Sequence, residues 1–293
     1  MAPTKVALAG GTGNLGRAVL KALLDADFEV TVLSRSSQKP VDERATIIEV
    51  DYDSLDSLTS ALSDHDIVVN TIGRAPTEVG IRLIDAAVVA GVKHFLPSEY
   101  GTDTTHEKVR KVPLCAGRVA IQEHLKKVAR ESSLFYTLLI PGAFLDYGLQ
   151  TGFILNLAGP VADLYDGGDR KFSTTTLPGI GKAVVGIIRN PEATKNSAVF
   201  VSEADVSQNQ MLEISGKRVE TRVVRTADLE KEAYAELKKP NPRPAVFAVN
   251  FIRLILFGEG FGSLIESDRL SNELLGLRYL TEGELRDMVS RYI

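Results

Sequence analysis

The chain has 293 residues, with 34 Lys and Arg against 38 Asp and Glu, and a formal net charge of −4 at pH 7. This length allows a substantial core, and the slightly acidic balance excludes binding of nucleic acid or anionic membranes by net charge. The single cysteine, Cys115, excludes a disulfide scaffold. No signal-peptide pattern is seen, and the most apolar stretch, residues 245–258, contains Asn250 and Arg253 and is too short to cross a bilayer. We therefore expect a cytoplasmic protein.

The first 150 residues alternate short β-branched runs with longer amphipathic runs. We expect strands at 6–9, 29–33, 46–50, 67–71, 92–97 and 136–140, and helices at 15–24, 55–63, 79–90 and 117–131. Strands that are apolar throughout and separated by helices are typical of a parallel sheet covered on both faces. The pattern predicts an α/β fold, a Rossmann-like doubly wound parallel sheet of about seven strands.

After Pro141 the rhythm of the sequence changes. We expect a turn-rich segment at 163–171, strands at 199–201 and 220–224, and helices at 177–189, 227–239, from 245 onward and at 282–292. The sequence thus predicts a nucleotide-binding domain at residues 1–150. A smaller C-terminal lobe at residues 151–293 is expected to be partly interleaved with it.

A glycine-rich loop follows the first expected strand. Glycines there let the backbone turn tightly and approach a pyrophosphate, which the N–H groups of the following helix can bind. The alternative is an ordinary tight turn, because glycine triplets also occur by chance. The position of the loop, between a strand and a helix, favours a dinucleotide site formed by Gly10, Thr12, Gly13, Asn14, Leu15 and Gly16.

The end of the second strand indicates which dinucleotide is bound. An acidic residue there binds the ribose 2′-OH of NAD, whereas an arginine accommodates the 2′-phosphate of NADP. The segment offers Arg35 and Lys39 and contains no acid, so it predicts NADP(H). The alternative is a solvated basic loop.

Two further strand ends fit a cofactor site. Asp51 and Tyr52 follow the third strand, where they can reach an adenine, and Thr71, Ile72 and Gly73 end the fourth. Ligands of open α/β sheets bind at this carboxyl edge. Each segment alone is equally consistent with ordinary turn chemistry.

Several segments together resemble one family. They are GGTGNLGRAVLKALL near the N-terminus, TIG at 71–73, FLPSEYG at 95–101, YT at 136–137 with PGAF at 141–144, and residues 272–274 and 280–285. This chain resembles the NmrA-like, isoflavone reductase-like family of atypical short-chain dehydrogenases, in the form of its fungal members. The resemblance implies an NADPH-dependent reductase acting on a small metabolite. It also places Pro97, Ser98 and Glu99 beside the cofactor. The net charge argues against direct contact with nucleic acid, and the sequence leaves a monomer and a homodimer equally open.

The resemblance identifies one candidate catalytic residue. Reductases of this family carry a lysine at the start of the helix after the PSEYG motif, and the corresponding position here is Arg118. Arginine stays protonated and is a poor general acid, although it can hold a ribose or stabilise developing negative charge. Lys108 and Lys111, in the preceding loop, are alternatives with flanking residues that do not match.

Aromatic residues near the junction are candidates for the wall of a substrate pocket. Any single aromatic is more often part of the core, yet ligand pockets are mostly apolar. The candidates are Tyr100, Phe144, Tyr147, Phe153 and Phe172. The four histidines, at 65, 94, 106 and 124, have no HxH or HExxH spacing, so no metal site is expected.

The leading functional hypothesis is hydride transfer from NADPH to an activated C=C, C=O or C=N bond of a small secondary metabolite, an iminium included. Two alternatives stay open. One is an NADP(H)-sensing regulator that binds a protein partner without turnover. The other is a cyclase-like enzyme that uses the same pocket.

Overall fold

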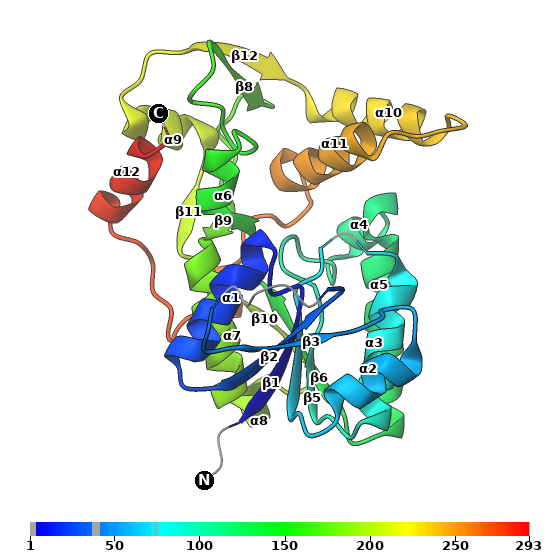
Figure 1. The fold of residues 1–293 in the computed structure, drawn as a ribbon. Coiled ribbons are helices and arrows are strands. Elements are labelled where there is room, and N and C mark those ends of the chain that lie inside the picture. Colours follow the sequence, from blue (N-terminus) through cyan, green and yellow to red (C-terminus); the bar gives the residue numbers. More distant parts are fainter. Residues whose placement is uncertain (1–3, 37–41, 74, 293) are drawn as a thin grey trace.

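The structure, a computed structural model, describes residues 4–36, 42–73 and 75–292. Within these residues, seven parallel strands form one sheet in the order β10-β6-β5-β4-β1-β2-β3 (Figure 1). The strands are β1 (Lys5–Ala9), β2 (Glu29–Ser34), β3 (Thr46–Glu49), β4 (Ile67–Asn70), β5 (His94–Leu96), β6 (Phe135–Ile140) and β10 (Ser197–Phe200). The predicted Rossmann-like sheet is therefore confirmed.

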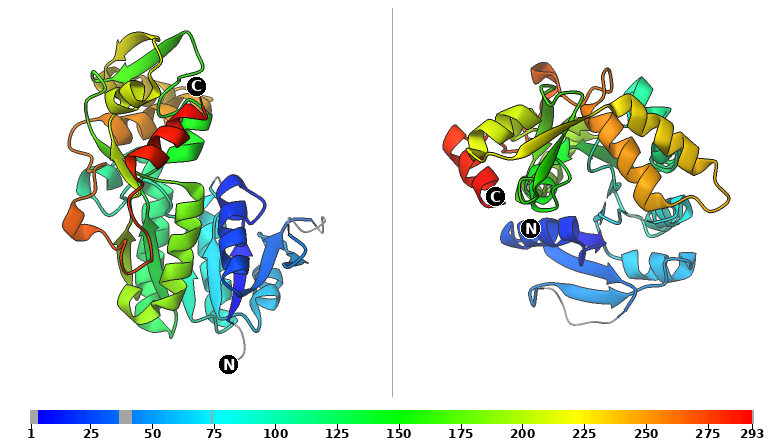
Figure 2. Two further views of the ribbon diagram at one scale, coloured as in Figure 1. Left: turned by 90° about the vertical axis from the view of Figure 1, so that its left-hand side faces the viewer. Right: turned by 90° about the horizontal axis from the view of Figure 1, so that it is seen from above.

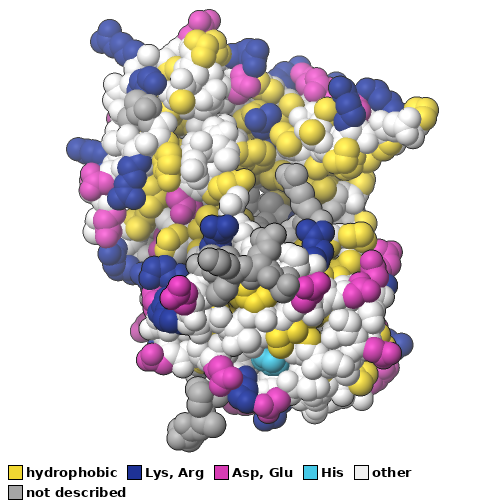
Figure 3. Space-filling view, in the orientation of Figure 1, with side chains coloured by type: hydrophobic (Ala, Val, Ile, Leu, Met, Phe, Trp, Pro, Cys, Tyr) yellow, Lys and Arg dark blue, Asp and Glu magenta, His cyan; other side chains and the backbone are white. Residues whose placement is uncertain are grey.

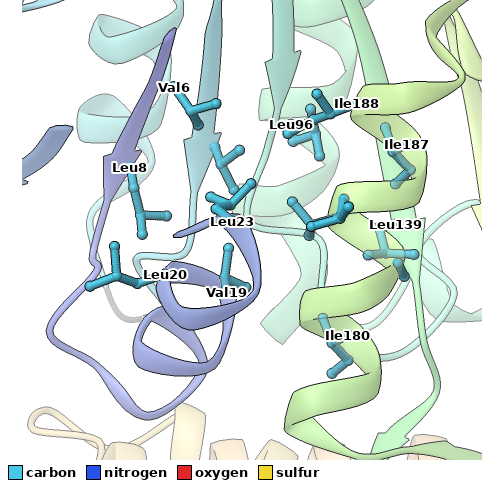
Figure 4. Close-up of a cluster of buried hydrophobic side chains, with 14 of the residues drawn as sticks. Val6, Leu8, Val19, Leu20, Leu23, Leu96, Leu139, Ile180, Ile187 and Ile188 are labelled. Carbon is cyan, nitrogen blue, oxygen red and sulfur yellow. The ribbon is translucent and has the colours of Figure 1, made fainter. Parts of the chain in front are cut away.

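Helices cover both faces of this sheet, as its apolar strands require. On one face lie α1 (Asn14–Asp25) and α7 (Leu177–Arg189), and on the other α2 (Leu55–Leu62), α3 (Thr77–Val89) and α5 (Ala116–Glu131). Figure 4 shows side chains of β1, including Val6 and Leu8, packed among those of α1 and α7. Each face thus has its own apolar core.

Helix α7 and strand β10 return to the sheet from the later part of the chain. Thr176 caps α7 by accepting the N–H of Gly179, and β10 pairs with β6 at the sheet edge. The two helices of this face approach closely, because a Cβ on Gly181 would lie 2.8 Å from the carbonyl oxygen of Ala18. The predicted division at residue 150 stays a prediction, but the contacts interleave the two parts strongly.

The remaining elements form a lobe above the carboxyl ends of the strands (Figures 1 and 2). Its strands are β7 (Ala143–Phe144), β8 (Val161–Tyr165), β9 (Phe172–Thr175), β11 (Ala204–Val206) and β12 (Glu220–Val224). Its helices are α6 (Leu145–Gln150), α9 (Gln208–Ser215), α10 (Thr226–Leu237), α11 (Pro244–Phe257) and α12 (Glu282–Ser290). The predicted turn-rich segment at 163–171 is wrong in its first part, because β8 extends to Tyr165 and pairs with β12.

The connection after β5 joins the lobe to the sheet unit. It contains α4 (Glu107–Arg110) and a short 3₁₀ helix (Pro113–Cys115), and short helices also occur as α8 (Pro191–Thr194) and at Ser267–Arg269. Val109 and Val112 of this connection share an apolar cluster with Phe251 and Phe261. Nearby, Lys108 donates a hydrogen bond to the carbonyl oxygen of Glu259 at 2.7 Å. The lobe is thus fixed over the sheet edge.

None of the described helices combines the length and the apolarity needed to span a membrane.

Candidate active site

The loops after β1 and β4 lie side by side at the point where the strand order reverses. Thr71 ties them together, since its Oγ1 donates to the carbonyl oxygen of Ala9 at 2.8 Å. A Cβ on Gly10 would lie 2.9 Å from the backbone nitrogen of Ile72, and Gly10 has a φ of +80°, so glycine is required there. Gly73 follows this contact and is exposed. In open α/β sheets this crevice binds the ligand.

The first turn of α1 presents unpaired backbone donors to this crevice. The N-cap residue, Gly13, has no side chain that could cap the helix, and the first turn contains no acidic residue. Thr12 and Asn14 are exposed beside it, and Leu15 is half-buried. A helix N-terminus with free N–H groups and no local negative charge is suited to an anion. The residues therefore fit the pyrophosphate of a dinucleotide.

The end of β2 adds an exposed cation to the same edge. Arg35 has no ion pair with any residue that the structure describes, and Lys39 lies outside the described residues. The side chain of Tyr52 is fixed against β2, because its hydroxyl donates to the carbonyl oxygen of Leu33 at 3.1 Å. Burial raises the pKa of Tyr52, so this hydroxyl stays a donor. Asp51 is exposed, and its carboxylate accepts the N–H of Asp53 at 2.9 Å.

The segment after β5 contains a buried carboxyl group. Pro97 is buried, Ser98 is half-buried, and Glu99 is 1% exposed. Glu99 accepts a hydrogen bond from the hydroxyl of Thr104 at 2.6 Å, and Gln122 of α5 donates to Thr104. Burial raises the pKa of Glu99, with the charge of Arg118 acting in the opposite direction.

Arg118 lies at the start of α5 and is held from three directions. Its Nη2 donates to Thr102 Oγ1 at 3.2 Å and to Cys115 Sγ at 3.3 Å, and its Nη1 lies 3.9 Å from Glu99 Oε2. These contacts fix a positive charge beside the PSEYG segment. Its role in catalysis stays a prediction.

The lobe meets the sheet edge at a small cavity of roughly 20 Å³. Its walls include Gly142 after β6, Thr102 after β5, and Ile255 and Leu256 near the end of α11. In the space-filling view the surface is hollowed between the lobe and the sheet unit, with hydrophobic side chains over α10 and α11 (Figure 3). The carboxyl edge is thus roofed by apolar residues of the lobe.

Comparison with known proteins identifies the family. The model of the NmrA-like family matches residues 3–257. This chain belongs to the NmrA-like family. The resemblance inferred from the sequence motifs is therefore confirmed.

Relatives of this NmrA-like chain include two fungal proteins. Oxidoreductase aprR of Aspergillus flavus is 29% identical over 281 residues, covering 93% of this chain and 94% of that protein. Oxidoreductase poxI of Penicillium oxalicum is 32% identical over 218 residues, covering 72% and 68%. A solved structure described as AtPrR2 with NADP+ and (+)-pinoresinol has a TM-score of 0.78 and 21% identity over the whole of both chains. That structural likeness shows the fold.

The aromatic residues predicted for the pocket of this NmrA-like protein separate into two groups. Phe144 and Phe153 are half-buried, and Tyr147 is 37% exposed. Tyr100 packs on the core that lies between the sheet and helices α1 and α7, and its buried hydroxyl has no partner among the described residues. Phe172 requires a correction: it is 0% exposed and packs edge-on against Phe257, at 5.3 Å between centroids, so it belongs to the core of the lobe.

Sequence reasoning missed Thr104 and Gln122, which hold Glu99. Neither belongs to a motif, and their meeting depends on how the connection after β5 folds back onto α5. Within the described ranges no group of three or more His, Cys, Asp or Glu side chains is arranged to hold a metal ion.

Proposed function

We propose that this NmrA-like chain is an NADP(H)-dependent oxidoreductase that reduces an activated C=C, C=O or C=N bond of a small secondary metabolite. The observation that carries the proposal is the uncapped, acid-free start of α1 at the point where the strand order reverses, with the exposed cation Arg35, unpaired among the described residues, at the end of β2. The names of the two fungal relatives and the NADP+ in the AtPrR2 structure support it.

In this proposal different residues at the carboxyl edge of the sheet bind different parts of the cofactor. The N–H groups of Asn14, Leu15 and Gly16 hold the pyrophosphate, and Arg35 pairs with the 2′-phosphate through its planar guanidinium. Pro97 and Ser98 border the same crevice. When bound, NADPH supplies the hydride.

Arg118 is proposed to stabilise negative charge that develops on the substrate. A fixed guanidinium loses little free energy to reorganisation, because Glu99, Thr102 and Cys115 already hold it. Arginine does not donate its proton at neutral pH, so the proposal assigns no proton transfer to it. An iminium substrate, which is cationic before reduction, needs no strong acid.

The half-buried and exposed aromatic residues of the junction are proposed to position the substrate. Phe144, Tyr147 and Phe153 lie on β7, on α6 and just after α6, all following the end of β6. Tyr100 is contributed by the sheet unit, and its buried hydroxyl has no partner among the described residues. A mostly apolar pocket with few polar groups suits a flat organic molecule.

The test is a calorimetric titration of NADPH and NADH into the purified protein, followed by an assay of NADPH oxidation. The assay uses a pool of unsaturated ketones, imines and phenylpropanoids. We expect tighter binding of NADPH than of NADH, and substrate-dependent loss of NADPH absorbance. Equal or tighter binding of NADH contradicts the assignment of Arg35.

A second candidate function is an NADP(H)-sensing regulator, which the arginine at position 118 favours. It predicts tight binding of NADPH with no turnover across the whole pool. Conversion of a pool member without NADPH oxidation would instead indicate the cyclase-like activity.

A further inference from the structure

One cation in the lobe has no polar partner. Arg253 of α11 is half-buried, and among the described residues it is the one lysine or arginine that is not exposed and makes neither a hydrogen bond nor an ion pair. Its Nε is buried without a partner. Two rings flank its guanidinium, those of Phe153 at 5.3 Å and of Tyr165 at 5.2 Å from the ring centroid.

Among the described residues, no acidic side chain forms an ion pair with Arg253. Burial raises the pKa of Tyr165 and the charge of Asp163 is close enough to raise it further, but the carboxylate of Asp163 is already paired with Arg222 at 2.6 Å. A buried donor left unpaired destabilises the fold, and contacts with aromatic faces offset only part of that cost. Helix α11 is otherwise strongly apolar, so an aliphatic side chain would fit this position without that cost.

Arg253 lies close to the proposed active site along α11. It is one helical turn before Leu256, which lines the small cavity together with Gly142 and Ala143. Residues three apart lie on the same side of a helix, separated by a rise of about 4.5 Å. Its contacts with the rings of Phe153 and Tyr165 place the guanidinium on the side of α11 that faces β8 and the segment just after α6.

We propose that Arg253 binds the carboxylate of a planar aromatic substrate, with Phe153 and Tyr165 packing beside the guanidinium. A guanidinium pairs with a carboxylate through two parallel N–H···O bonds, and the two Nη groups of Arg253, which no described residue engages, would donate them. This inference rests on the proposed function for the reaction, because it names the substrate class of that site. The binding itself requires no cofactor.

The experiment compares trans-cinnamate with its neutral analogue cinnamamide by isothermal titration calorimetry, with and without NADP+. For the wild-type protein we expect cinnamate to bind at least about tenfold more tightly than cinnamamide. Arg253→Met should remove this preference, and Arg253→Lys should keep part of it. Arg225→Met, a change at an exposed cation of the same lobe without a described partner, is the matched control and should leave the preference intact.

Thermal melting separates loss of the site from loss of the fold. Methionine suits the apolar surroundings of α11, so Arg253→Met should melt at or above the wild-type temperature. The inference is overturned if the wild type binds neither probe or shows no preference, or if Arg253→Met retains the preference.

The two proposals fail in different ways. If cinnamate binding depends on Arg253 but the protein does not bind NADPH, the carboxylate site is supported and the proposed reductase activity is contradicted. If the protein reduces neutral substrates and shows no preference for a carboxylate, the reductase activity is supported and the carboxylate site is contradicted.

Discussion

Arg118 is already held in place before any substrate arrives, and this makes its contribution measurable. Replacing it with alanine removes a positive charge from the site, and loss of one such preorganised donor typically lowers kcat on the order of a hundredfold. We expect Arg118→Ala to lower kcat by about that factor with a small change in KM, and Arg118→Lys to retain most activity. Steady-state kinetics on the substrate found in the pool assay measures both. Unchanged turnover of Arg118→Ala would exclude a role in the reaction.

Arg35 is expected to determine the choice between NADPH and NADH. Loss of a charge-assisted pair with a phosphate costs about 1.5–3 kcal/mol, which corresponds to roughly ten- to a hundredfold in affinity. Arg35→Ala should weaken NADPH binding by this factor and leave NADH binding almost unchanged, as measured by calorimetry. Arg130→Ala, at an exposed arginine near the far end of α5, serves as the control and should alter neither affinity.

Glu99 makes the stability of the protein depend on pH in a direction opposite to that of most carboxylates. Burial raises the pKa of Glu99 in the folded state above its ordinary value of 4.5. Its contribution to the free energy of unfolding is therefore fully present below pH 4.5, and it is lost as the pH rises through the pKa of the folded state. Glu99→Gln does not titrate. The free energy of unfolding of this variant, minus that of the wild type, should therefore increase with pH in urea denaturation.

Glu107→Gln is the matched control for that measurement. Its pair with Lys111 lowers the pKa of Glu107, so the wild-type residue stabilises the fold only above its ordinary pKa. The same difference should then decrease, not increase, as the pH rises. A difference for Glu99→Gln that is flat with pH would contradict the assigned direction.

The sequence predicts those site residues whose role depends on their neighbours in the chain. The glycine loop and Arg35 directly follow strands, so their place at the sheet edge follows from the strand pattern. The opposite holds for Phe172 and Arg253. Nothing local distinguishes Phe172 in the core from Phe153 near the surface. Arg253 acquires its aromatic neighbours only through folding, from the segment just after α6 and from β8.

At the scale of elements, the start of α1 requires glycine at position 16. A Cβ on Gly16 would lie 2.0 Å from the carbonyl oxygen of Gly10, so the loop must move to accept it. We expect Gly16→Ala to destabilise the protein by about 1–3 kcal/mol and to weaken NADPH binding. Urea denaturation and calorimetry measure the two effects.

Gly283→Ala is the corresponding control in a different helix. Gly283 lies inside α12, and the nearest atom to an added Cβ is Thr281 Oγ1 at 4.0 Å. Alanine should therefore stabilise this helix by about 0.5–1 kcal/mol. If both variants lost stability equally, the close contact in the glycine loop would not explain the result.

Some elements were predicted with their observed bounds, and others in the lobe were missed. Helix α7 and strand β12 have the predicted bounds, 177–189 and 220–224. Strand β8 was missed because it begins in a segment that continues into Asp166, Gly167 and Gly168, a strong turn signal. Helix α6 was missed because it is short and contains Gly148, where a Cβ would lie 2.3 Å from Ile154.

At the scale of the whole molecule, Phe261 joins the lobe to the sheet unit. It is 4% exposed and shares a cluster with residues of α11 and of the connection after β5, and Lys108 lies 4.0 Å above its ring. We expect Phe261→Ala to lower the free energy of unfolding by about 3–5 kcal/mol. Hydrogen exchange should increase at residues 107–115 and 244–257 and stay unchanged in α7. Faster exchange throughout the protein would show that the two parts do not open separately.

The return of α7 and β10 to the sheet has a consequence for how the chain is made. A ribosome releases the N-terminal strands long before residue 200, so β6 first emerges as an open edge and α1 emerges without the helix that covers its apolar side. Those surfaces invite association with other nascent chains. The ribosome makes α6, β8 and β9 after β6 and before α7 and β10. Most of the first half of the lobe is therefore synthesised before the nucleotide-binding unit can close. The nucleotide-binding unit therefore closes only after β8 and β9 have been made, whereas α10 and α11 of the lobe follow later still.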